Sequence, residues 1–279
     1  MIENQIWLDK IVRMALEEDL GAGDLTSDAI VDPQIRGRAV LEAREQMVLA
    51  GLPVFKRVFR LLSSGIEFEC YFADGRPVPA GEKICTLSGS LSAILKAERT
   101  ALNFMQRMSG IATLTREYVD KAGSGKTRIL DTRKTAPGLR LLDKYAVRMG
   151  GGFNHRLGLS DGILIKDNHI AAVGSIDRAV ALARENAPHT IKIEVEVENL
   201  TGVEEAITAG ADVILLDNMT PDEIIKAVDL ADGRVTIEAS GGINLDNIRE
   251  IAQTGVDLIS VGALTHSARA VDISLEVIP

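Results

Sequence analysis

Residues 191–240 decide the fold of this chain: they read IKIEVEVENL TGVEEAITAG ADVILLDNMT PDEIIKAVDL ADGRVTIEAS. Residues 191–197, residues 213–217 and a third segment ending at Ser240 form apolar runs of strand length, and amphipathic stretches of helical period separate them. Strands joined through helices run parallel, because each helix returns the chain to the edge from which it left. This stretch therefore predicts a parallel sheet covered by helices.

The same strand-and-helix unit recurs from residue 127 to residue 262. Polar or small residues close its strands, at Asp131, Lys166, Glu196, Asp217, Ser240 and Gly262, and helix starts are predicted at Ser175, at Thr201 with Glu204, at Thr220-Pro221 with Glu223 and at Asn244. A closed barrel of eight units needs about 250 residues. We therefore expect an incomplete parallel α/β barrel of six or seven strands, with a doubly wound sheet as the alternative.

Residues 1–105 lack this repeat and predict a small α+β sandwich domain. A helix is expected over 4–20 and another over 53–62, with short strands between and after them, among them an alternating strand from residue 67. A helix beginning at Ser90 or Ser92 is expected to break near Ser109-Gly110, before a second helix to Lys121. The barrel then covers 106–267, and the alternating segment 268–279 is expected to return to the first domain as an edge strand.

Composition narrows the class of protein. The chain has 40 acidic and 31 basic residues and a net charge of −9, which argues against a nucleic-acid partner, because binding phosphate backbones needs a broad basic face. No segment has the apolar length of a membrane span, and no leader pattern opens the chain, so we expect a soluble, cytoplasmic protein. Cys70 and Cys85 lack metal-ligand spacing and predict buried, reduced thiols.

Two charged or glycine-rich segments allow more than one interpretation. Residues 122–127 are similar to the end of a phosphate-binding P-loop, but Asp120 occupies a position where that motif has glycine, and a strand rather than a helix follows, so we reject a nucleotide P-loop. The cations Arg140, Lys144 and Arg148 recur every four residues, so they fit a solvated helix face as well as a ligand site.

Residues 131–170 carry seven lysines and arginines against four aspartates, a local excess of positive charge in an acidic chain. Arg133, Lys134, His155, Arg156 and Lys166 fit a solvated helix poorly, because several of them follow buried strands. The carboxyl ends of parallel strands open onto one face. We interpret this cluster of cations as a site for a small polyanion.

The remaining strand ends add carboxylates and glycines. Glu196 and Asp217 would bind ribose hydroxyls, bind a divalent cation, or form ion pairs with Lys134 and Lys166. The segments Ser240-Gly241-Gly242 and Val261-Gly262-Ala263 follow the last two strands, where glycines let a phosphate approach backbone N–H groups. A phosphate cup, sugar-binding carboxylates and several cations together describe a site for a phosphoribosyl donor.

Seven motifs, in order along essentially the whole chain, resemble quinolinate phosphoribosyltransferase, also called nicotinate-nucleotide pyrophosphorylase (carboxylating). They are DTRKTAPG at 131–138, GGGFNHRL at 150–157, LIKDNH at 164–169, EVEV at 194–197, LLDN at 215–218, SGG at 240–242 and VGALTH at 261–266. The resemblance implies a small N-terminal α/β domain followed by an incomplete barrel, and a homodimer with shared active sites. It also implies conversion of quinolinate and phosphoribosyl pyrophosphate, with Mg²⁺, into nicotinate mononucleotide, CO₂ and pyrophosphate in NAD biosynthesis.

The resemblance also implies roles for individual residues. Thr132, Arg133, Lys134, His155, Arg156 and Lys166 would surround quinolinate and pyrophosphate, together with Arg99 of the neighbouring subunit. Glu196 and Asp217 would face the ribose and hold magnesium, through water, while Ser240, Gly241, Gly242, Val261, Gly262 and Ala263 would bind the 5′-phosphate. Lys134, Lys166, Glu196 and Asp217 would be catalytic.

Three alternatives stay open at this point. One is a related group, similar in sequence, that is linked to molybdenum transport. Another is a Schiff-base barrel aldolase that would use Lys166 as its nucleophile. The third is a noncatalytic sensor of phosphosugars, which would leave the carboxylates without a role.

Overall fold

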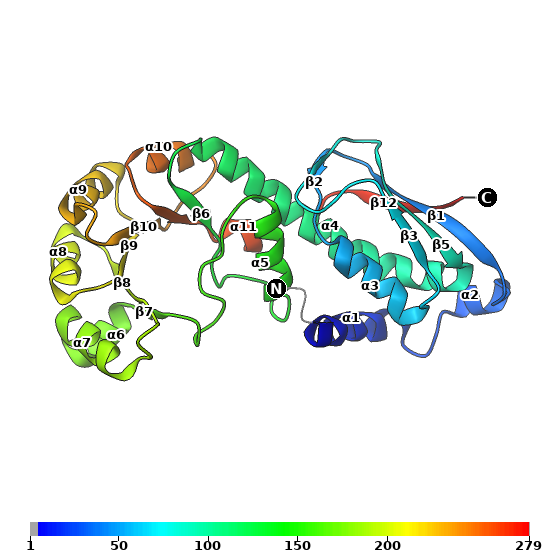
Figure 1. Cartoon of the computed structure of the whole chain (residues 1–279), viewed down its shortest axis with the longest axis horizontal. Coiled ribbons are helices and arrows are strands. Elements are labelled where there is room, and N and C mark those ends of the chain that lie inside the picture. Colours follow the sequence, from blue (N-terminus) through cyan, green and yellow to red (C-terminus); the bar gives the residue numbers. More distant parts are fainter. Residues whose placement is uncertain (1–4, 279) are drawn as a thin grey trace. The chain divides into compact units, whose positions relative to one another are not determined.

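The computed structural model describes residues 5–278, and the chain divides into two compact units. Of the described residues, one unit contains 5–116, 135–151 and 265–278, and the other contains 117–134 and 152–264. The units therefore interleave along the sequence. Each unit has its own sheet (Figure 1).

The first unit is built on an antiparallel sheet of four strands in the order β12-β1-β5-β3. The alternating C-terminal segment forms β12, which pairs with β1 along its whole length. The elements of this unit, besides the long helix described next, are α1 (Gln5–Leu20), α2 (Leu25–Ile30), β1 (Arg36–Ala43), β2 (Met47–Val48), α3 (Leu52–Leu62), β3 (Glu67–Cys70), β4 (Pro77–Val78), β5 (Lys83–Ser90), α5 (Arg140–Met149) and β12 (Ile273–Ile278).

Helix α4 (Leu91–Ala122) is continuous, and the predicted break at Ser109-Gly110 is wrong. The Ser109 hydroxyl bonds to the backbone N–H and carbonyl of Ala50, at 3.0 and 3.1 Å, which satisfies this polar group in the core. A Cβ at position 110 would lie 1.9 Å from the carbonyl oxygen of Arg269. Contacts with distant segments therefore explain why serine and glycine occur at positions 109 and 110, where the sequence alone predicted a break in the helix.

The three cations of α5 differ in exposure: Arg148 is exposed, Arg140 is half-buried and Lys144 is buried. The Lys144 side chain is 1% exposed, and its neighbour Asp143 is fully buried. Asp143 pairs with the Arg107 guanidinium at 2.9 Å and also accepts the Ala136 N–H. The interpretation as a solvated face is therefore wrong for Lys144.

The second unit is a parallel sheet of six strands in the order β6-β11-β10-β9-β8-β7, as the strand-and-helix repeat predicted. Its edge strands β6 and β7 do not pair with each other among the described residues, so the sheet is an open, incomplete barrel. Helices α7, α8 and α9 follow one another along its outer side (Figure 1). The elements are β6 (Arg128–Leu130), β7 (Ile163–Ile165), α6 (Asp167–Val173), α7 (Ile176–Asn186), β8 (Ile193–Val197), α8 (Leu200–Ala209), β9 (Val213–Asp217), α9 (Pro221–Ala231), β10 (Thr236–Ser240), α10 (Ile248–Gln253), β11 (Leu258–Ser260) and, after it, the short α11 (Ala263–His266).

The predicted helix starts are partly confirmed. Ser175 caps α7 by accepting the Arg178 N–H, and Thr220 forms a capping box with Glu223 at α9. Helix α8 begins earlier than predicted, because Asn199 rather than Thr201 supplies the cap.

Helix α10 begins later than predicted, at Ile248. The Asn244 side chain accepts the N–H groups of Asp246 and Asn247, at 2.8 and 3.2 Å. Asparagine in this role closes a turn and competes with a helix. The first residues of the expected helix therefore form that turn.

Both cysteines are free, as predicted, and they face each other across β3 and β5. Cys85 is buried, whereas Cys70 is only half-buried. Among residues 5–278, no helix combines the length and the apolar character that crossing a membrane requires.

Candidate active site

The strand ends of the second unit bring several predicted residues to one edge of the sheet. Ser240 lies directly opposite Asp217 in the register of β10 and β9, and Glu196 of β8 pairs with Leu215 of β9. Because parallel strands of similar length end together, the side chains that close β8, β9 and β10 share this edge. Lys166 follows β7, the next strand of the sheet.

Lys166 forms an ion pair with Glu196. The lysine side chain is 43% exposed and the glutamate side chain 17% exposed, so a ligand can still reach this pair. One of the open interpretations, that the carboxylates pair with lysines, is thus confirmed for this couple. Asp217 differs, because its carboxylate accepts the side-chain N–H of Asn218 at 3.0 Å.

The other predicted cations lie on segments that follow β6 or precede β7. The Thr132 hydroxyl accepts the Lys134 N–H at 3.0 Å, which turns the chain directly after Asp131, and Arg133 and Lys134 are exposed. The Arg156 guanidinium donates to the Gly162 carbonyl at 2.9 Å. Arg99 lies exposed on α4, in the first unit.

Asp131 fixes the segment that carries His155 and Arg156. Its carboxylate is fully buried and accepts the His155 N–H at 2.9 Å and the Asn154 amide at 2.5 Å. Phe153 bridges to Leu130 at the end of β6, and its ring lies 4.9 Å from the Arg128 guanidinium. A strand-end aspartate thus organises the next loop.

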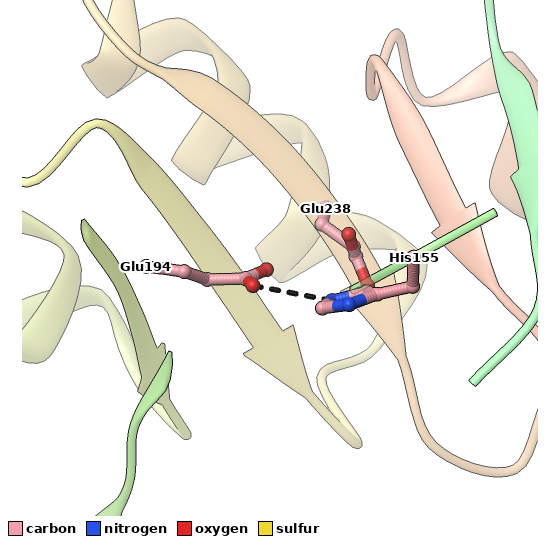
Figure 2. Close-up of side chains that lie close together, drawn as sticks. All are labelled: His155, Glu194 and Glu238. Atoms are coloured by element: carbon pink, nitrogen blue, oxygen red, sulfur yellow. Dashed lines mark ion pairs between the residues drawn. The ribbon is translucent and has the colours of Figure 1, made fainter. Parts of the chain in front are cut away.

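Two buried carboxylates beneath the strand ends were missed by the sequence reasoning. Glu194 of β8 and Glu238 of β10 both point toward the His155 ring (Figure 2), with Oε2 of Glu194 at 3.1 Å and Oε1 of Glu238 at 3.7 Å from its Nε2. The signal was present, since strand residues two apart share a face. Glu194 precedes Glu196 by two residues, and Glu238 precedes Ser240 by two.

Burial changes the ionisation of this group. It raises the pKa of Glu238 to about 7, helped by the nearby charge of Glu194, while His155 and a hydrogen bond from Ser260 oppose the shift. The pKa of Arg156 is lowered, first by burial and then by Arg133, and Glu194 opposes that shift. The negative charge of Glu194 therefore favours the protonated form of Arg156, although the cation Arg133 lies nearby.

The first predicted phosphate segment has a backbone that favours glycine. Gly241 and Gly242 have φ angles of +87° and +63°, in the left-handed region. A Cβ on Gly241 would lie 2.3 Å from the Asn218 side-chain oxygen, and Asn218 itself donates its N–H to the Ser240 carbonyl at 2.9 Å. Tight packing of the β9 and β10 ends thus requires glycine at position 241.

The second predicted phosphate segment joins β11 to α11. Val261 is buried and donates its N–H to the Leu130 carbonyl at 2.9 Å, while Gly262 and Ala263 are half-buried. Helix α11 starts at Ala263. The segment therefore lies between the ends of β11 and β6, neighbouring strands of the sheet.

Comparison with known proteins covers almost the whole chain. Residues 111–276 match the family model "Quinolinate phosphoribosyl transferase, C-terminal domain", and residues 24–109 match the corresponding N-terminal domain. The "Probable nicotinate-nucleotide pyrophosphorylase [carboxylating]" of Bacillus subtilis is 47% identical over 274 residues, which are 98% of this chain and 94% of that protein. The protein with the same description from Synechocystis is 45% identical, over 98% of this chain and 93% of its own length.

A solved structure agrees with these sequence matches. The nicotinate-nucleotide pyrophosphorylase of Francisella tularensis superposes with a TM-score of 0.94 at 45% identity, covering 98% of this chain and 96% of that one. Both domains, their order and the sequence motifs at the strand ends thus agree with one family. The chain belongs to the quinolinate phosphoribosyltransferase family and is a decarboxylating phosphoribosyltransferase of de novo NAD biosynthesis.

Proposed function

We propose that the strand ends of the six-stranded sheet bind phosphoribosyl pyrophosphate and quinolinate side by side. The observation that carries this assignment is the Lys166–Glu196 ion pair, which lies next to Asp217 and Ser240 at one edge of the sheet. A cation and carboxylates at one edge match the opposite charges that develop on the leaving group and on the sugar.

The donor would lie across the carboxyl ends of β8 to β11. Its 5′-phosphate would face the backbone at Ser240, Gly241, Gly242, Val261, Gly262 and Ala263. The left-handed turn at Gly241 and Gly242 supports this placement, because backbone without Cβ atoms allows close approach of a phosphate. Glu196 and Asp217 would face the ribose hydroxyls.

Quinolinate would be held by Thr132, Arg133, Lys134, His155, Arg156 and Lys166, and by Arg99 from a second subunit. The acceptor is a dianion, and guanidinium groups bind carboxylates through two parallel hydrogen bonds. Such two-point contacts would aim the ring nitrogen at C1 of the ribose. Fixed orientation of the two reactants accounts for a large share of the rate in transfers of this kind.

Magnesium fits the residues at this edge. Glu196 and Asp217 end neighbouring strands and offer carboxylate oxygens, the hard ligands that Mg²⁺ prefers, often through retained water. The bound ion would neutralise part of the pyrophosphate charge. Because Lys166 forms an ion pair with Glu196, its ammonium group would lie beside the bound ion and the departing pyrophosphate.

The transfer breaks the bond between C1 and the pyrophosphate oxygen and forms a bond from C1 to the quinolinate nitrogen. Positive charge on the ribose in the transition state would be stabilised by Glu196 and Asp217, and negative charge on the leaving group by Lys134 and Lys166. The alkylated ring nitrogen is cationic, so it stabilises the electron pair left on the adjacent ring carbon when the carboxylate departs as CO₂, and that carbon then takes up a proton from solvent.

Release of pyrophosphate and CO₂ on mixing the protein with both substrates tests this proposal. We predict turnover with quinolinate and little with nicotinate, because nicotinate lacks the second carboxylate that the cations of the site would bind. Nucleotide formation from nicotinate alone would overturn the acceptor assignment. Failure of borohydride to trap carbonyl substrates would separate the transferase from an aldolase that uses Lys166.

Assembly and location complete the proposal. A homodimer that shares Arg99 between subunits would place a cation from the first unit of one chain beside the strand ends of the other. We also propose a cytoplasmic location, as the matches to the bacterial proteins suggest; one Nicotiana tabacum relative, 41% identical, is described as mitochondrial.

A further inference from the structure

We propose that Glu194 is a positioning residue for Arg156 and that it acts through the ring of His155, with Glu238 as a second buried carboxylate beside that ring. The inference rests on the proposed function in one respect, the role of Arg156 as a ligand of quinolinate. It concerns two residues to which the family resemblance gave no role.

The contacts form a continuous path from the sheet to Arg156. The Nε2 atom of His155 lies 3.1 Å from Glu194 and 3.7 Å from Glu238, and its Nδ1 accepts the Arg156 N–H at 2.7 Å. Figure 2 shows the two carboxylates approaching the ring from β8 and β10. Strand β9 lies between β8 and β10 in the sheet. The two glutamates project from the same face of the sheet, so both can reach the ring across β9.

The two ring nitrogens have opposite partners, and this fixes the tautomer. Nδ1 accepts a hydrogen bond, so it carries no proton, and Nε2 carries the proton and donates toward Glu194. A carboxylate behind a histidine commonly sets which nitrogen is protonated. Glu194 therefore keeps Nδ1 free to accept the Arg156 N–H.

A metal site is the competing interpretation of these residues. The His155, Glu194 and Glu238 ligand atoms lie within 4.8 Å of one another, as metal ligands would. A metal on Nε2 would require the proton on Nδ1, where it would meet the Arg156 N–H. The donor geometry therefore favours a proton on Nε2 rather than a metal ion.

The burial of these carboxylates argues for a role beyond packing. Glu194 is 7% exposed and Glu238 is 1% exposed, and one oxygen of each lacks a hydrogen-bond partner. Burying such groups is costly, and apolar side chains would fill the sheet interior at lower cost. The buried carboxylates instead help to orient Arg156, whose backbone N–H donates to His155 and whose guanidinium donates to the Gly162 carbonyl.

The test compares Glu194→Met, Glu194→Gln and His155→Phe by steady-state kinetics with each substrate varied separately. We expect Glu194→Met to raise the KM for quinolinate about tenfold or more, while the KM for phosphoribosyl pyrophosphate changes less than about twofold. His155→Phe, which also removes the proposed contact with quinolinate, should raise the KM for quinolinate at least as much. Glu194→Gln should restore most of the loss, since an amide oxygen still accepts the Nε2 proton. Val195→Ala is the matched control, because this buried residue of β8 points to the opposite face.

A double-mutant cycle tests the path itself. In an Arg156→Ala background, Glu194→Met should add little further loss, because the guanidinium that the path orients toward quinolinate is already absent. Equal increases in both KM values, full additivity with Arg156→Ala, or a Glu194→Gln protein as impaired as Glu194→Met would overturn the inference. So would stoichiometric zinc in the purified protein that is lost in His155→Phe.

Failure of the inference and failure of the proposed function give different results. If only the inference fails, the wild-type protein still releases pyrophosphate from phosphoribosyl pyrophosphate in the presence of quinolinate, and the variants change neither KM selectively. Loss of the proposed function removes pyrophosphate release from the wild type itself. If Glu194→Met does not fold, the KM values of His155→Phe and Glu194→Gln still test the inference.

Discussion

At the scale of single residues, the Lys166–Glu196 pair has two roles that mutation separates. Lys166→Met should leave the fold intact and lower kcat about a hundredfold or more if, as proposed, the lysine charge stabilises the departing pyrophosphate. Lys134→Met should behave similarly. Circular dichroism checks the fold, and pyrophosphate release measures turnover. Lys192→Met, an exposed lysine just before β8, is the control. Unchanged turnover in both site variants would leave the lysines as structural ion-pair partners.

Glu238 makes stability depend on pH in a direction that its burial sets. Its pKa is raised from 4.5 to about 7 in the folded protein, so the folded state binds more protons than the unfolded state between these values. The free energy of unfolding therefore falls as pH rises through this window. Glu238→Gln removes this titration and should gain up to about 3 kcal/mol relative to wild type between pH 5 and pH 8.

Urea unfolding of both proteins at pH 5, 6, 7 and 8 checks this prediction. The amide preserves the shape of the side chain and can donate to Glu194, so the comparison isolates the proton. A stability difference that stays constant across these pH values would show that Glu238 is ionised in the folded protein throughout.

At the scale of elements, α4 illustrates how packing overrides local preference. Helix propensity alone favours Gly110→Ala by about 1 kcal/mol. The added Cβ would meet the Arg269 carbonyl oxygen at 1.9 Å, so we expect destabilisation of about 2 kcal/mol or more. Gly125→Ala is the matched control, because no atom lies within 4 Å of its added Cβ. Thermal unfolding measures both; a stabilised Gly110→Ala protein would show that the backbone at Arg269 yields easily.

Packing also constrains the turn after β10, where the 5′-phosphate is proposed to bind. Gly241 combines a positive φ angle with a close approach to Asn218. Alanine there would strain the backbone and push against the end of β9. The start of helix α9, by contrast, depends on two residues three positions apart, Thr220 and Glu223. It could therefore be predicted from the sequence.

At the scale of the whole molecule, the proposed shared site predicts complementation. Arg99 belongs to the first unit and Arg133 to the second. Arg99→Ala and Arg133→Ala proteins should each be inactive, yet a mixed dimer has one site with both arginines and one with neither. Equal amounts, unfolded together and refolded, should recover about a quarter of the wild-type rate, since half of the dimers are mixed and half of their sites are complete.

Size-exclusion chromatography must first establish that the parents and the mixture are dimers, and each parent refolded alone serves as the control. Mixing without unfolding should recover activity only as fast as subunits exchange. A verified mixed dimer without activity would place Arg99 in the site of its own chain or outside the chemistry.

The sequence by itself determined what depends on neighbouring residues. Alternating strands and helices, the capping residues Ser175 and Thr220, and the polar residues closing each strand follow from periodicity and from contacts within four positions. These signals predicted an incomplete parallel barrel and the edge at which Glu196, Asp217 and Ser240 meet. Parallel strands all end on one side of a sheet, whatever their order. This edge could therefore be predicted without knowing the order of the strands.

Only the tertiary structure decided which polar residues are buried together. His155, Glu194 and Glu238 are distant in sequence and meet because β8 and β10 flank β9 in a curved sheet. Lys144 and Gly110 were misread for the same reason: their roles depend on segments far away along the chain. Local sequence fixes which face of a strand or helix a side chain occupies, but the partner across that face is set by the packing of the whole chain.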